Sequence, residues 1–312
     1  MAKSNTGAGR RLRYWLAGGA CLLTLATVVR HALFLAVEED AFEPKPAGAA
    51  DALTPDRLGV ASRQFAFASG ARMLRASCVL ARGGDAPAVL IYHGDEENLS
   101  DWASAQALLY HNGVSSCVFD YSGYGASGGK PGVVNLHEDG LAAYGQFLAM
   151  TPRASRRYVM GFSLGSGVLL DVISALRPAP AGLVIAAGFT SAREAAVVTG
   201  RVPAWMARLL PEPWDNEAQL RKSVLPLLLV HSRADEVIPF AYAERLERAA
   251  GGPSQLVALP ALPHDAAIEP QRQGAEGVRP FFFAYGRHER RPRRDYASSG
   301  RLAPTVLKPA ST

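Results

Sequence analysis

Short apolar runs alternate with helix-like segments through most of the chain, and this alternation limits the possible folds more than any other feature. The stretch APAVLIYHG at 86–94 is short and continuously apolar, as expected of a strand buried on both faces. An amphipathic segment at 100–113 follows it, and the same order of strand and helix recurs downstream. Strands that alternate with helices predict a mostly parallel sheet with helices on both faces.

The remaining runs bring the expected number of strands to eight. The stretch at 64–81 reads as a hairpin that turns at Ser69-Gly70 and gives the sheet an antiparallel edge. The segment at 188–224 contains Trp205 and Trp214 and is too apolar for a plain connection, so we predict a short lid or insert there. Further strands are expected in VSSCVFDY, RRYVMGFS, GLVIAAG, LPLLLVHS and SQLVALP, with helices at 133–150, 164–176 and 241–250.

The charge of the chain is concentrated at its two ends. The net charge is +5, but residues 1–14 carry +4 and residues 286–312 carry +5, so residues 15–285 sum to −4. This mildly acidic body argues against nucleic-acid binding. The Pro-, Ala- and acid-rich stretch 38–57 is expected to be a linker, the folded domain to cover 58–285, and the basic tail 286–312 to be disordered.

Residues 15–37 form an apolar stretch that is interrupted by Arg30 and His31. The uninterrupted part, 15–29, has the length of a signal-peptide core, whereas the whole stretch is long enough to span a bilayer. Basic residues precede it and acidic residues follow, which predicts a cytoplasmic N-terminus and an exported domain. No clear cleavage site follows, so we favour a transmembrane anchor over a cleaved signal, with a buried helix of a soluble protein as the third alternative.

Arginine far outnumbers lysine in the chain, which is typical of a bacterium with a high-GC genome. Together with the charge pattern around the apolar stretch, this predicts a single-pass protein of the bacterial inner membrane. Its folded domain is then expected on the periplasmic side.

The three cysteines, Cys21, Cys78 and Cys117, are too few for a disulfide framework or a metal cluster. The sequence also has no C-x-x-C and no H-E-x-x-H motif, so no metal site is predicted. Cys78 and Cys117 both lie in strand-like runs, and we expect two buried free thiols. A bridge between them stays open as an alternative if the domain is exported.

The sequence Gly161-Phe162-Ser163-Leu164-Gly165 fits the pattern G-x-S-x-G and lies between an expected strand and an expected helix. A tight strand-to-helix turn lifts the serine hydroxyl clear of the sheet, in a strained conformation that requires small residues two positions before and after it. The helix that begins there directs its N–H groups towards the same point. We therefore predict Ser163 as a nucleophile and the N–H of Leu164 as one donor of an oxyanion hole.

A serine nucleophile needs a base and a carboxylate that orients the base. His264 is the best candidate for the base, because it follows the last expected strand on a loop at a carboxyl end. The acid should follow another strand, between Ser163 and His264 in sequence. The stretch LPLLLVHSRADEVIP supplies Asp235 there as the preferred acid, with Glu236 as a weaker candidate.

The second oxyanion donor is expected in the loop after the strand at 86–92, as the backbone N–H of Asp95. The carboxylates of Asp95, Glu96 and Glu97 present a difficulty, because a negative charge that faces the hole would repel the oxyanion. They must therefore point away or be neutralised. His93, in the same loop, is expected to be a structural residue.

Several pieces of the sequence resemble the α/β-hydrolase superfamily, in the right order over 58–285. They are YHGDEEN, FDYSGYGASGG, GFSLGSG, HSRADEVIPF and the histidine of LPH. Within the superfamily the chain resembles the lid-poor serine hydrolases of the BEM46-like and ABHD13/ABHD17-like type. It departs from them at Asp95, where they usually have Asn, at Ser232, where they usually have Gly, and at Leu262-Pro263 before His264.

The resemblance implies an α/β-hydrolase fold and cleavage of an ester or thioester bond in a small-molecule or lipid-like acyl substrate. Tyr124, Trp205 and Met206 are then candidates for the substrate pocket. Two alternatives remain, an acylaminopeptidase-like hydrolase and a catalytically weak scaffold of the same fold.

The stretch from Gly123 to Gly128 also fits G-x-G-x-x-G, a pattern of dinucleotide-binding folds. In such folds the third glycine opens a helix, whose N-terminus meets the phosphates. Here Gly129-Lys130-Pro131-Gly132 follow Gly128 and prolong a loop. We therefore expect neither NAD nor FAD, nor any other cofactor.

Overall fold

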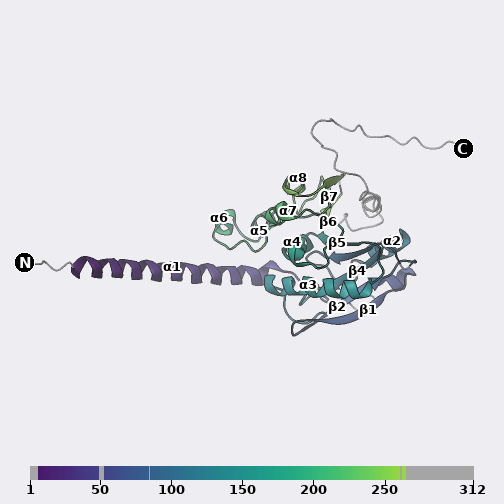
Figure 1. Ribbon diagram of the computed structural model, residues 1–312, viewed down its shortest axis with the longest axis horizontal. Helices are drawn as coiled ribbons and strands as arrows, with labels where there is room; N and C mark the ends of the chain where they lie inside the picture. The colour runs from purple at the N-terminus through teal and green to yellow at the C-terminus, as the bar shows by residue number, and fades with distance from the viewer. Residues whose placement is uncertain (1–5, 49–52, 84, 261, 265–312) are drawn as a thin grey trace, which may run out of the picture.

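An eight-stranded sheet forms the centre of the protein in the computed structural model, which describes residues 6–48, 53–83, 85–260 and 262–264. The strand order is β1-β2-β4-β3-β5-β6-β7-β8; β2 pairs antiparallel with β1 and β4, and all other neighbours are parallel. This confirms the predicted, mostly parallel sheet with an antiparallel edge (Figure 1). The strands are β1 (Arg63–Ser69), β2 (Arg72–Val79), β3 (Ala88–Tyr92), β4 (Ser115–Asp120), β5 (Arg157–Phe162), β6 (Leu183–Ala186), β7 (Leu227–Ser232) and β8 (Ser254–Leu259).

Helices cover both faces of the sheet, as predicted. In β3, Leu90 points into the larger apolar cluster, whereas Val89 and Ile91 point into a second cluster on the opposite face. This strand is apolar throughout because both of its faces are covered. The helices are α1 (Thr6–Ala41), α2 (Ala103–His111), α3 (Val133–Met150), α4 (Leu164–Val172), α5 (Ala192–Val198), α6 (Ala204–Ala207), α7 (Asn216–Lys222) and α8 (Phe240–Ala249), with 3₁₀ turns at Pro55–Leu58 and Ile173–Ala175.

The carboxyl ends of the parallel strands meet at one edge of the sheet. The loops after β3, β5, β7 and β8 all begin at this edge, and open α/β sheets bind ligands there. The residues predicted to react, Ser163, Asp235 and His264, lie on three of these loops. The topology therefore brings them to the same side of the molecule.

α1 is a long helix that projects from the body (Figure 1). Its segment Tyr14–Ala41 is long and apolar enough to cross a membrane. The helix continues to Ala41, into the stretch 38–57 that the sequence assigns to a linker, and Phe42 is then buried against the body. The predicted basic tail, 286–312, lies outside the described residues.

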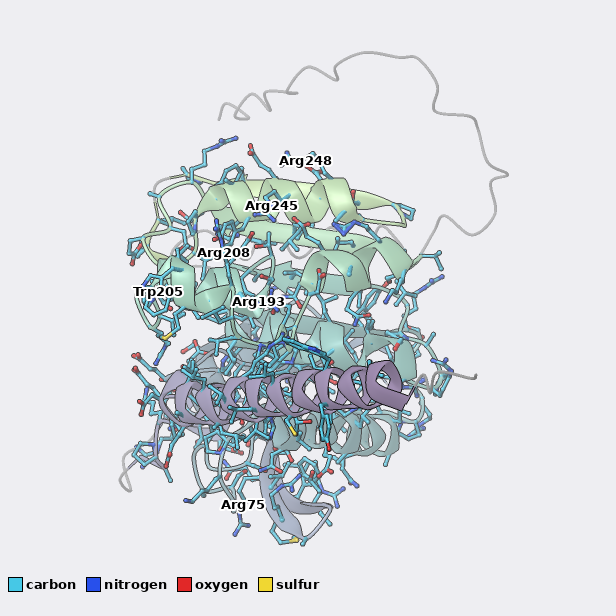
Figure 2. All side chains as sticks on the ribbon, turned by 90° about the vertical axis from the view of Figure 1, so that its left-hand side faces the viewer. Arg75, Arg193, Trp205, Arg208, Arg245 and Arg248 are labelled. Atoms are coloured by element: carbon cyan, nitrogen blue, oxygen red, sulfur yellow. A yellow bond between two sulfur atoms is a disulfide. The ribbon has the colours of Figure 1, made fainter. Side chains whose placement is uncertain are left out.

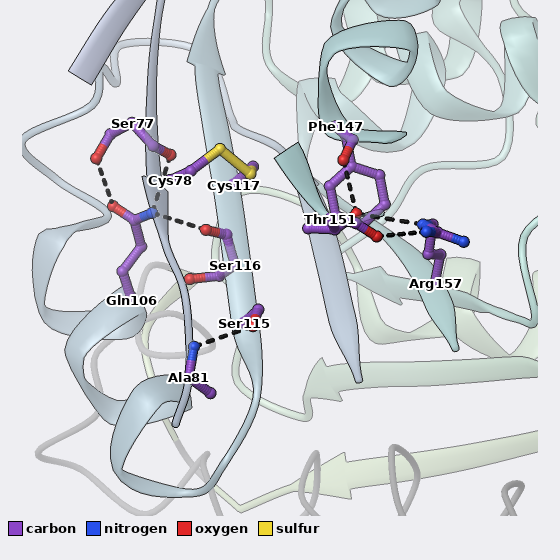
Figure 3. The surroundings of a disulfide bond; sticks show 10 residues. All are labelled: Ser77, Cys78, Ala81, Gln106, Ser115, Ser116, Cys117, Phe147, Thr151 and Arg157. Atoms are coloured by element: carbon purple, nitrogen blue, oxygen red, sulfur yellow. Dashed lines mark hydrogen bonds between the residues drawn. A yellow bond between two sulfur atoms is a disulfide. The ribbon is translucent and has the colours of Figure 1, made fainter. Parts of the chain in front are cut away.

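Cys78 of β2 and Cys117 of β4 form a disulfide bond (Figure 3). The two residues are direct partners in the antiparallel register, with their Cα atoms 4.1 Å apart. The prediction of two free thiols is therefore wrong. The sequence places both residues in strands, but it does not reveal that these strands are neighbours. Cys21, in α1, is a free and exposed cysteine.

Candidate active site

Ser163 forms the turn between β5 and α4, with φ 48° and ψ −117°. This is a backbone conformation that residues other than glycine rarely adopt. The Ser163 N–H donates to the carbonyl of Ala186 at 3.0 Å, and the Ser166 hydroxyl donates to the Ser163 carbonyl at 2.7 Å. These hydrogen bonds hold the strained turn, which has the strand-to-helix context expected from the sequence.

The two glycines of the motif allow α4 to approach the sheet closely. A Cβ atom at Gly165 would lie 1.9 Å from the carbonyl oxygen of Tyr92, and one at Gly161 would lie 2.6 Å from the carbonyl oxygen of Gly165. Neither position therefore accepts a side chain without a shift of the backbone. This close approach is the physical reason for the spacing of the motif.

A chain of hydrogen bonds connects Ser163, His264 and Asp235. Nε2 of His264 lies 3.1 Å from Oγ of Ser163, and Nδ1 of His264 lies 2.8 Å from Oδ2 of Asp235. The imidazole is buried and packs against the ring of Phe162, with 5.2 Å between the ring centroids. The arrangement suits proton transfer from a serine hydroxyl to an imidazole that a carboxylate orients.

Asp235 accepts more hydrogen bonds than the one from His264. Its Oδ1 accepts from the N–H groups of Val237 and Ile238, and its Oδ2 lies 3.2 Å from Nε2 of His231. Burial acts to raise the pKa of Asp235, but the hydrogen bonds from His231 and His264 outweigh it and hold this pKa well below its ordinary value. Asp235 is therefore ionised over the whole neutral range.

The loop that carries His264 is fixed by two side chains near the end of β7. The Ser232 hydroxyl donates to the carbonyl of Leu262 and accepts from its N–H. Glu236, the weaker candidate for the acid, accepts from the backbone N–H of His264 at 3.2 Å. Ser232, where similar hydrolases usually have glycine, thus ties the His264 loop to the strand that precedes Asp235.

The carboxylate of Asp95 is directed to three donors. They are the hydroxyl of Tyr124, the backbone N–H of Glu43 at 3.0 Å and the guanidinium of Arg201 at 3.4 Å. Burial raises the pKa of Asp95, and the hydrogen bond from Tyr124 opposes this rise. For Asp95 these contacts remove the difficulty raised by the sequence, because donors hold its carboxylate and Arg201 offsets its charge.

The loop after β3 is held from inside the protein. His93 is fully buried, its Nδ1 lies 2.7 Å from the carbonyl of Gly94, and burial lowers its pKa to about 4, so the ring is neutral. Glu97 accepts from the N–H of Gly94 and from the indole N–H of Trp102. These contacts fit the structural role expected for His93.

A pocket of about 1150 Å³ contains Ser163 and His264. Pockets of this size hold drug-sized or longer ligands. Its walls come from three regions far apart in sequence: the C-terminal turns of α1, the loop after β3, and the segment from α5 to Trp214. Apolar residues of the lining include Phe34, Val37, Phe189, Leu210 and Trp214.

Tyr124, Trp205 and Met206, which the sequence suggests for the pocket, are not among its described lining residues. Tyr124 is fully buried and reaches Asp95 from behind, Trp205 is 68% exposed on the outside of α6, and Met206 packs in a cluster with the end of α1. The sequence does not place the end of α1 at the pocket. The apolar residues beyond Arg30-His31 were the available signal.

The glycine-rich loop after β4 does not lead directly into a helix. The Gly123 N–H donates to the carbonyl of Gly128 at 3.1 Å, which closes the loop on itself, and α3 begins only at Val133. In a dinucleotide-binding fold the third glycine would open the helix. The loop instead places Tyr124 beneath Asp95.

Comparisons with known proteins relate the chain to a family of hydrolases. The family described as serine aminopeptidase, S33, matches residues 85–216. An uncharacterised protein of Mycobacterium tuberculosis (strain H37Rv) is 31% identical over 186 residues, which are 59% of this chain and 64% of that protein. This chain thus spans about 64% of that relative's length. The human alpha/beta hydrolase domain-containing protein 17B is 29% identical over 174 residues, 51% of this chain and 55% of that protein.

Solved structures share the fold. The esterase Pf2001 of Pyrococcus furiosus superimposes with a TM-score of 0.62 at 19% identity, over 78% of this chain and 99% of that chain. The sheet order, the strand-to-helix serine turn and these similarities agree with one another. The chain has the α/β-hydrolase fold, and the matching family and relatives support a member of the α/β-hydrolase superfamily.

Proposed function

We propose that the protein is a serine hydrolase that cleaves ester or thioester bonds of acyl substrates, with Ser163, His264 and Asp235 as catalytic residues. The observation that supports this most directly is the chain of hydrogen bonds from the Ser163 hydroxyl through His264 to Asp235, at a large pocket whose lining contains both apolar and charged residues. The similar fold of the esterase Pf2001 points in the same direction.

The reaction proceeds in two halves. Oγ of Ser163 attacks the acyl carbon while Nε2 of His264 accepts its proton, and the same proton then passes to the leaving alcohol or thiol. This leaves an acyl group on Ser163. Water repeats the sequence, gives a proton to His264 and releases the acid. Asp235, ionised throughout, stabilises the imidazolium in both halves.

Backbone N–H groups of Leu164 and Asp95 stabilise the tetrahedral intermediate. Leu164 begins α4, so its N–H has no partner within the helix and lies at the positive end of the helix dipole. Asp95 contributes through its backbone, while Tyr124 and Arg201 hold its carboxylate. Such donors act most strongly on the charge that develops in the transition state.

Labelling with a fluorophosphonate probe tests the nucleophile. The wild-type protein is expected to react, and Ser163→Ala to lose the label completely. The matched control is Ser174→Ala, which removes an exposed hydroxyl and should label like wild type. Folded wild-type protein that does not react would favour the scaffold alternative. A series of p-nitrophenyl esters of graded chain length then defines the acyl preference.

A peptidase activity is the second candidate. The matching family is described as serine aminopeptidase, and Glu43 and Glu96, which share a hydrogen bond, line the pocket. Carboxylates in this position are suited to hold the ammonium group of a peptide N-terminus. The test compares an aminoacyl p-nitroanilide with a p-nitrophenyl ester. A higher kcat/KM for the anilide, lost on Glu43→Gln, would replace the esterase proposal.

The body is proposed to lie outside the cytoplasm, with α1 as an uncleaved anchor and residues 1–14 inside. Two features support this arrangement. Phe34 and Val37 of α1 line the pocket, so cleavage of the segment would remove part of its wall. The Cys78–Cys117 disulfide suits an oxidising compartment. The proposed domain covers residues 58–285, and the proposed lid covers residues 188–224.

Washing membranes with alkaline carbonate tests the anchor. The mature protein should stay in the membrane pellet at its full mass. A soluble product that lacks residues 1–37 would contradict the anchor and show a cleaved signal, whatever the outcome of the activity assays.

A further inference from the structure

The segment 203–210, which contains α6 and is called here the α6 segment, has an apolar outer face. Trp205 is 68% exposed and Leu209 is 55% exposed, and Arg208 between them is also exposed. Ala207 and Leu210 point inwards and are buried. Large exposed apolar side chains beside a cationic one are typical of a surface that meets another phase or partner.

The inner face of the α6 segment packs on α1. Ala207 and Leu210 form a cluster with Leu33, Phe34 and Val37, and the Arg30 guanidinium donates to the carbonyl of Leu210 at 3.3 Å. In Figure 1, α6 is the part of the body that reaches furthest along α1 towards its N-terminus. Figure 2 looks onto the side from which α1 projects and shows Trp205 and Arg208 on that side.

The length of α1 sets the level of the membrane relative to this segment. The uninterrupted apolar part, 15–29, has fifteen residues, and at about 1.5 Å per residue it is about 22 Å long. The hydrocarbon core of a bilayer is about 30 Å thick. If the core begins at Trp15, next to the basic residues that precede it, a thickness of about 30 Å extends past Arg30 to the level of Leu33, where the α6 segment packs.

The residue types at this level suit the boundary of a bilayer. Tryptophan is enriched at the membrane–water interface, and arginine there reaches anionic headgroups. Arg30 can extend its charge along the helix to the same boundary. A membrane that covers Trp205 and Leu209 would also remove from water an apolar surface that the protein itself leaves exposed.

The pocket extends to the same level of α1. Phe34 and Val37 line it together with Leu210, and the same pocket contains Ser163 and His264. The lining is thus apolar at the base of the α6 segment, and it carries charged residues such as Glu43 and Arg201 elsewhere. A long acyl chain that enters at this base would contact Phe34, Val37 and Leu210 instead of water.

We propose that the outer face of the α6 segment docks on the outer leaflet of the bilayer, and that the pocket takes its substrate directly from that leaflet. The substrate class is then a membrane-resident ester or thioester with a long acyl chain, which enters between α1 and the α6 segment and presents its carbonyl carbon to Ser163. The substrate part of this proposal rests on the proposed function, whereas the docking part does not.

Tryptophan quenching tests the docking without any assay of activity. The full-length protein is placed in nanodiscs that contain phosphatidylcholine, phosphatidylglycerol and a lipid brominated near the headgroup end of its chain. Trp15→Phe is the background, because Trp15 lies in the membrane helix. Trp102 and Trp214 remain and are buried. Quenching is expected in this protein and should fall at least by about half in Trp15→Phe/Trp205→Phe. Equal quenching in both proteins would overturn the docking.

Two substrates test the delivery route. The double variant Trp205→Ser/Leu209→Ser is expected to lower kcat/KM about tenfold or more for a fluorogenic palmitoyl ester in the nanodisc, because interfacial binding scales with buried apolar area. Its kcat/KM for soluble p-nitrophenyl butyrate should stay within about twofold, because neither residue lines the pocket. Val224→Ser is the matched control. Val224 is 77% exposed and lies just before the amino end of β7, whereas the pocket lies at the carboxyl ends of the strands.

Each outcome decides a different point. Equal loss on both substrates, or a loss in the Val224→Ser control of the same size, would overturn the delivery route. Wild-type protein that cleaves the butyrate but not the embedded ester would also overturn it and leave the proposed function standing. Folded wild-type protein that cleaves neither ester would contradict the proposed function itself, while the quenching experiment would still decide the docking.

Discussion

The two walls of the pocket are built in different ways. The wall that carries the proposed catalytic residues, called here the catalytic wall, consists of loops that begin at the carboxyl ends of β3, β5, β7 and β8. The residues of β3, β5 and β7 are almost all buried, whereas β8, which precedes His264, is an edge strand with Leu259 as its buried residue. The opposite wall consists of the end of α1, of α5 and of Leu210, and α6 packs behind it on α1. The structure describes every residue of α5 and α6. No residue of α5 is buried, and in α6 only Ala207 is buried. The catalytic wall is therefore anchored mainly in the core of the protein, whereas the opposite wall packs on the surface of that core.

This difference follows from what each wall has to do. Proton transfer between Ser163 and His264 requires a geometry fixed to a fraction of an ångström, which buried strands can supply. A wall that admits substrate has to open, and segments that open are drawn from the least stable parts of a protein. We therefore expect changes in the catalytic wall to affect the chemistry, and changes in the opposite wall to affect access and local opening.

The largest effect is expected from His264→Ala. Loss of the base should lower kcat for a soluble ester by about 10⁵-fold or more, with little change in the melting temperature. His111→Ala, at the exposed end of α2, is the control and should keep full activity. Steady-state kinetics on p-nitrophenyl butyrate provide the measurement. More than about one hundredth of wild-type activity in His264→Ala would contradict the assigned base.

Asp235→Asn is expected to have the next largest effect. The amide cannot hold the imidazole in the required tautomer, so kcat should fall by about 10⁴-fold. Glu236→Gln is the control, because its carboxyl accepts from the backbone N–H of His264 and an amide oxygen can do the same. It should retain activity within about tenfold. Similar losses in the two variants would show that the acid has been assigned to the wrong carboxylate.

The pH dependence of stability gives a second measurement on Asp235. Its pKa in the folded protein lies well below the unfolded value of about 3.9. The ionised carboxylate therefore contributes stability above that pH, and the contribution is lost as the pH falls through the lower folded pKa. The difference in unfolding free energy between wild type and Asp235→Asn should be largest near neutral pH and shrink in acid. A difference independent of pH would contradict this.

The same contrast between the walls explains what the sequence could reveal. Ser163, Asp235 and His264 are predicted from the sequence because each lies within a few residues of the end of a strand-like run, which is a local signal. The contribution of Ser232 depends on the meeting of two loops, because its hydroxyl contacts Leu262, and no local pattern shows this. His231 contacts Asp235 four residues further along the chain, and this contact depends on the shape of the turn after β7. The Cys78–Cys117 bond was missed because only the order of the strands makes the two residues neighbours.

For the opposite wall, the sequence predicts the wrong residues as pocket lining. Trp205 and Met206 were proposed for the pocket because they are apolar and lie in the expected lid, but α6 turns Trp205 outwards and packs Met206 in the cluster at the end of α1. Of the residues of α1 that line the pocket, Phe34 and Val37 fall in the predicted membrane span and Glu38 and Ala41 in the predicted linker. An apolar pattern indicates burial, but it does not indicate whether lipid, substrate or protein covers the side chain.

Removal of the disulfide should affect stability but not catalysis. The bond links β2 and β4 near the antiparallel edge of the sheet and closes a sequence separation of 39 residues. Cys78→Ser/Cys117→Ser is expected to lower the unfolding free energy of the body by about 2 to 5 kcal/mol, with kcat unchanged. Denaturant unfolding followed by tryptophan fluorescence gives the measurement. Cys21→Ser, which removes the free thiol, should leave stability unchanged, and a large change in kcat in the double variant would contradict the independence of the catalytic wall.

A matched pair of valine truncations compares the two walls directly and has the smallest expected effect. Val230 of β7 is 1% exposed and Val202, between α5 and α6, is 3% exposed, so the same groups are removed from equally buried sites. Val230→Ala should lower the global unfolding free energy by about 2 kcal/mol, since its cavity lies in the core. Val202→Ala should leave the global value unchanged and lower only the local opening free energy around α5 and α6, by about 1 to 2 kcal/mol.

Native-state hydrogen exchange separates these outcomes. In Val202→Ala, amides of the lid such as those of Met206 and Leu210 should exchange about tenfold faster, while amides of β7 keep the wild-type rate. In Val230→Ala, amides that exchange only by global unfolding should all accelerate together. Faster exchange of the β7 amides in Val202→Ala would mean that the α5–α6 wall unfolds with the sheet. The two walls would then unfold as one cooperative unit. Substrate would have to enter either through the pocket as it stands or by an opening of the whole domain.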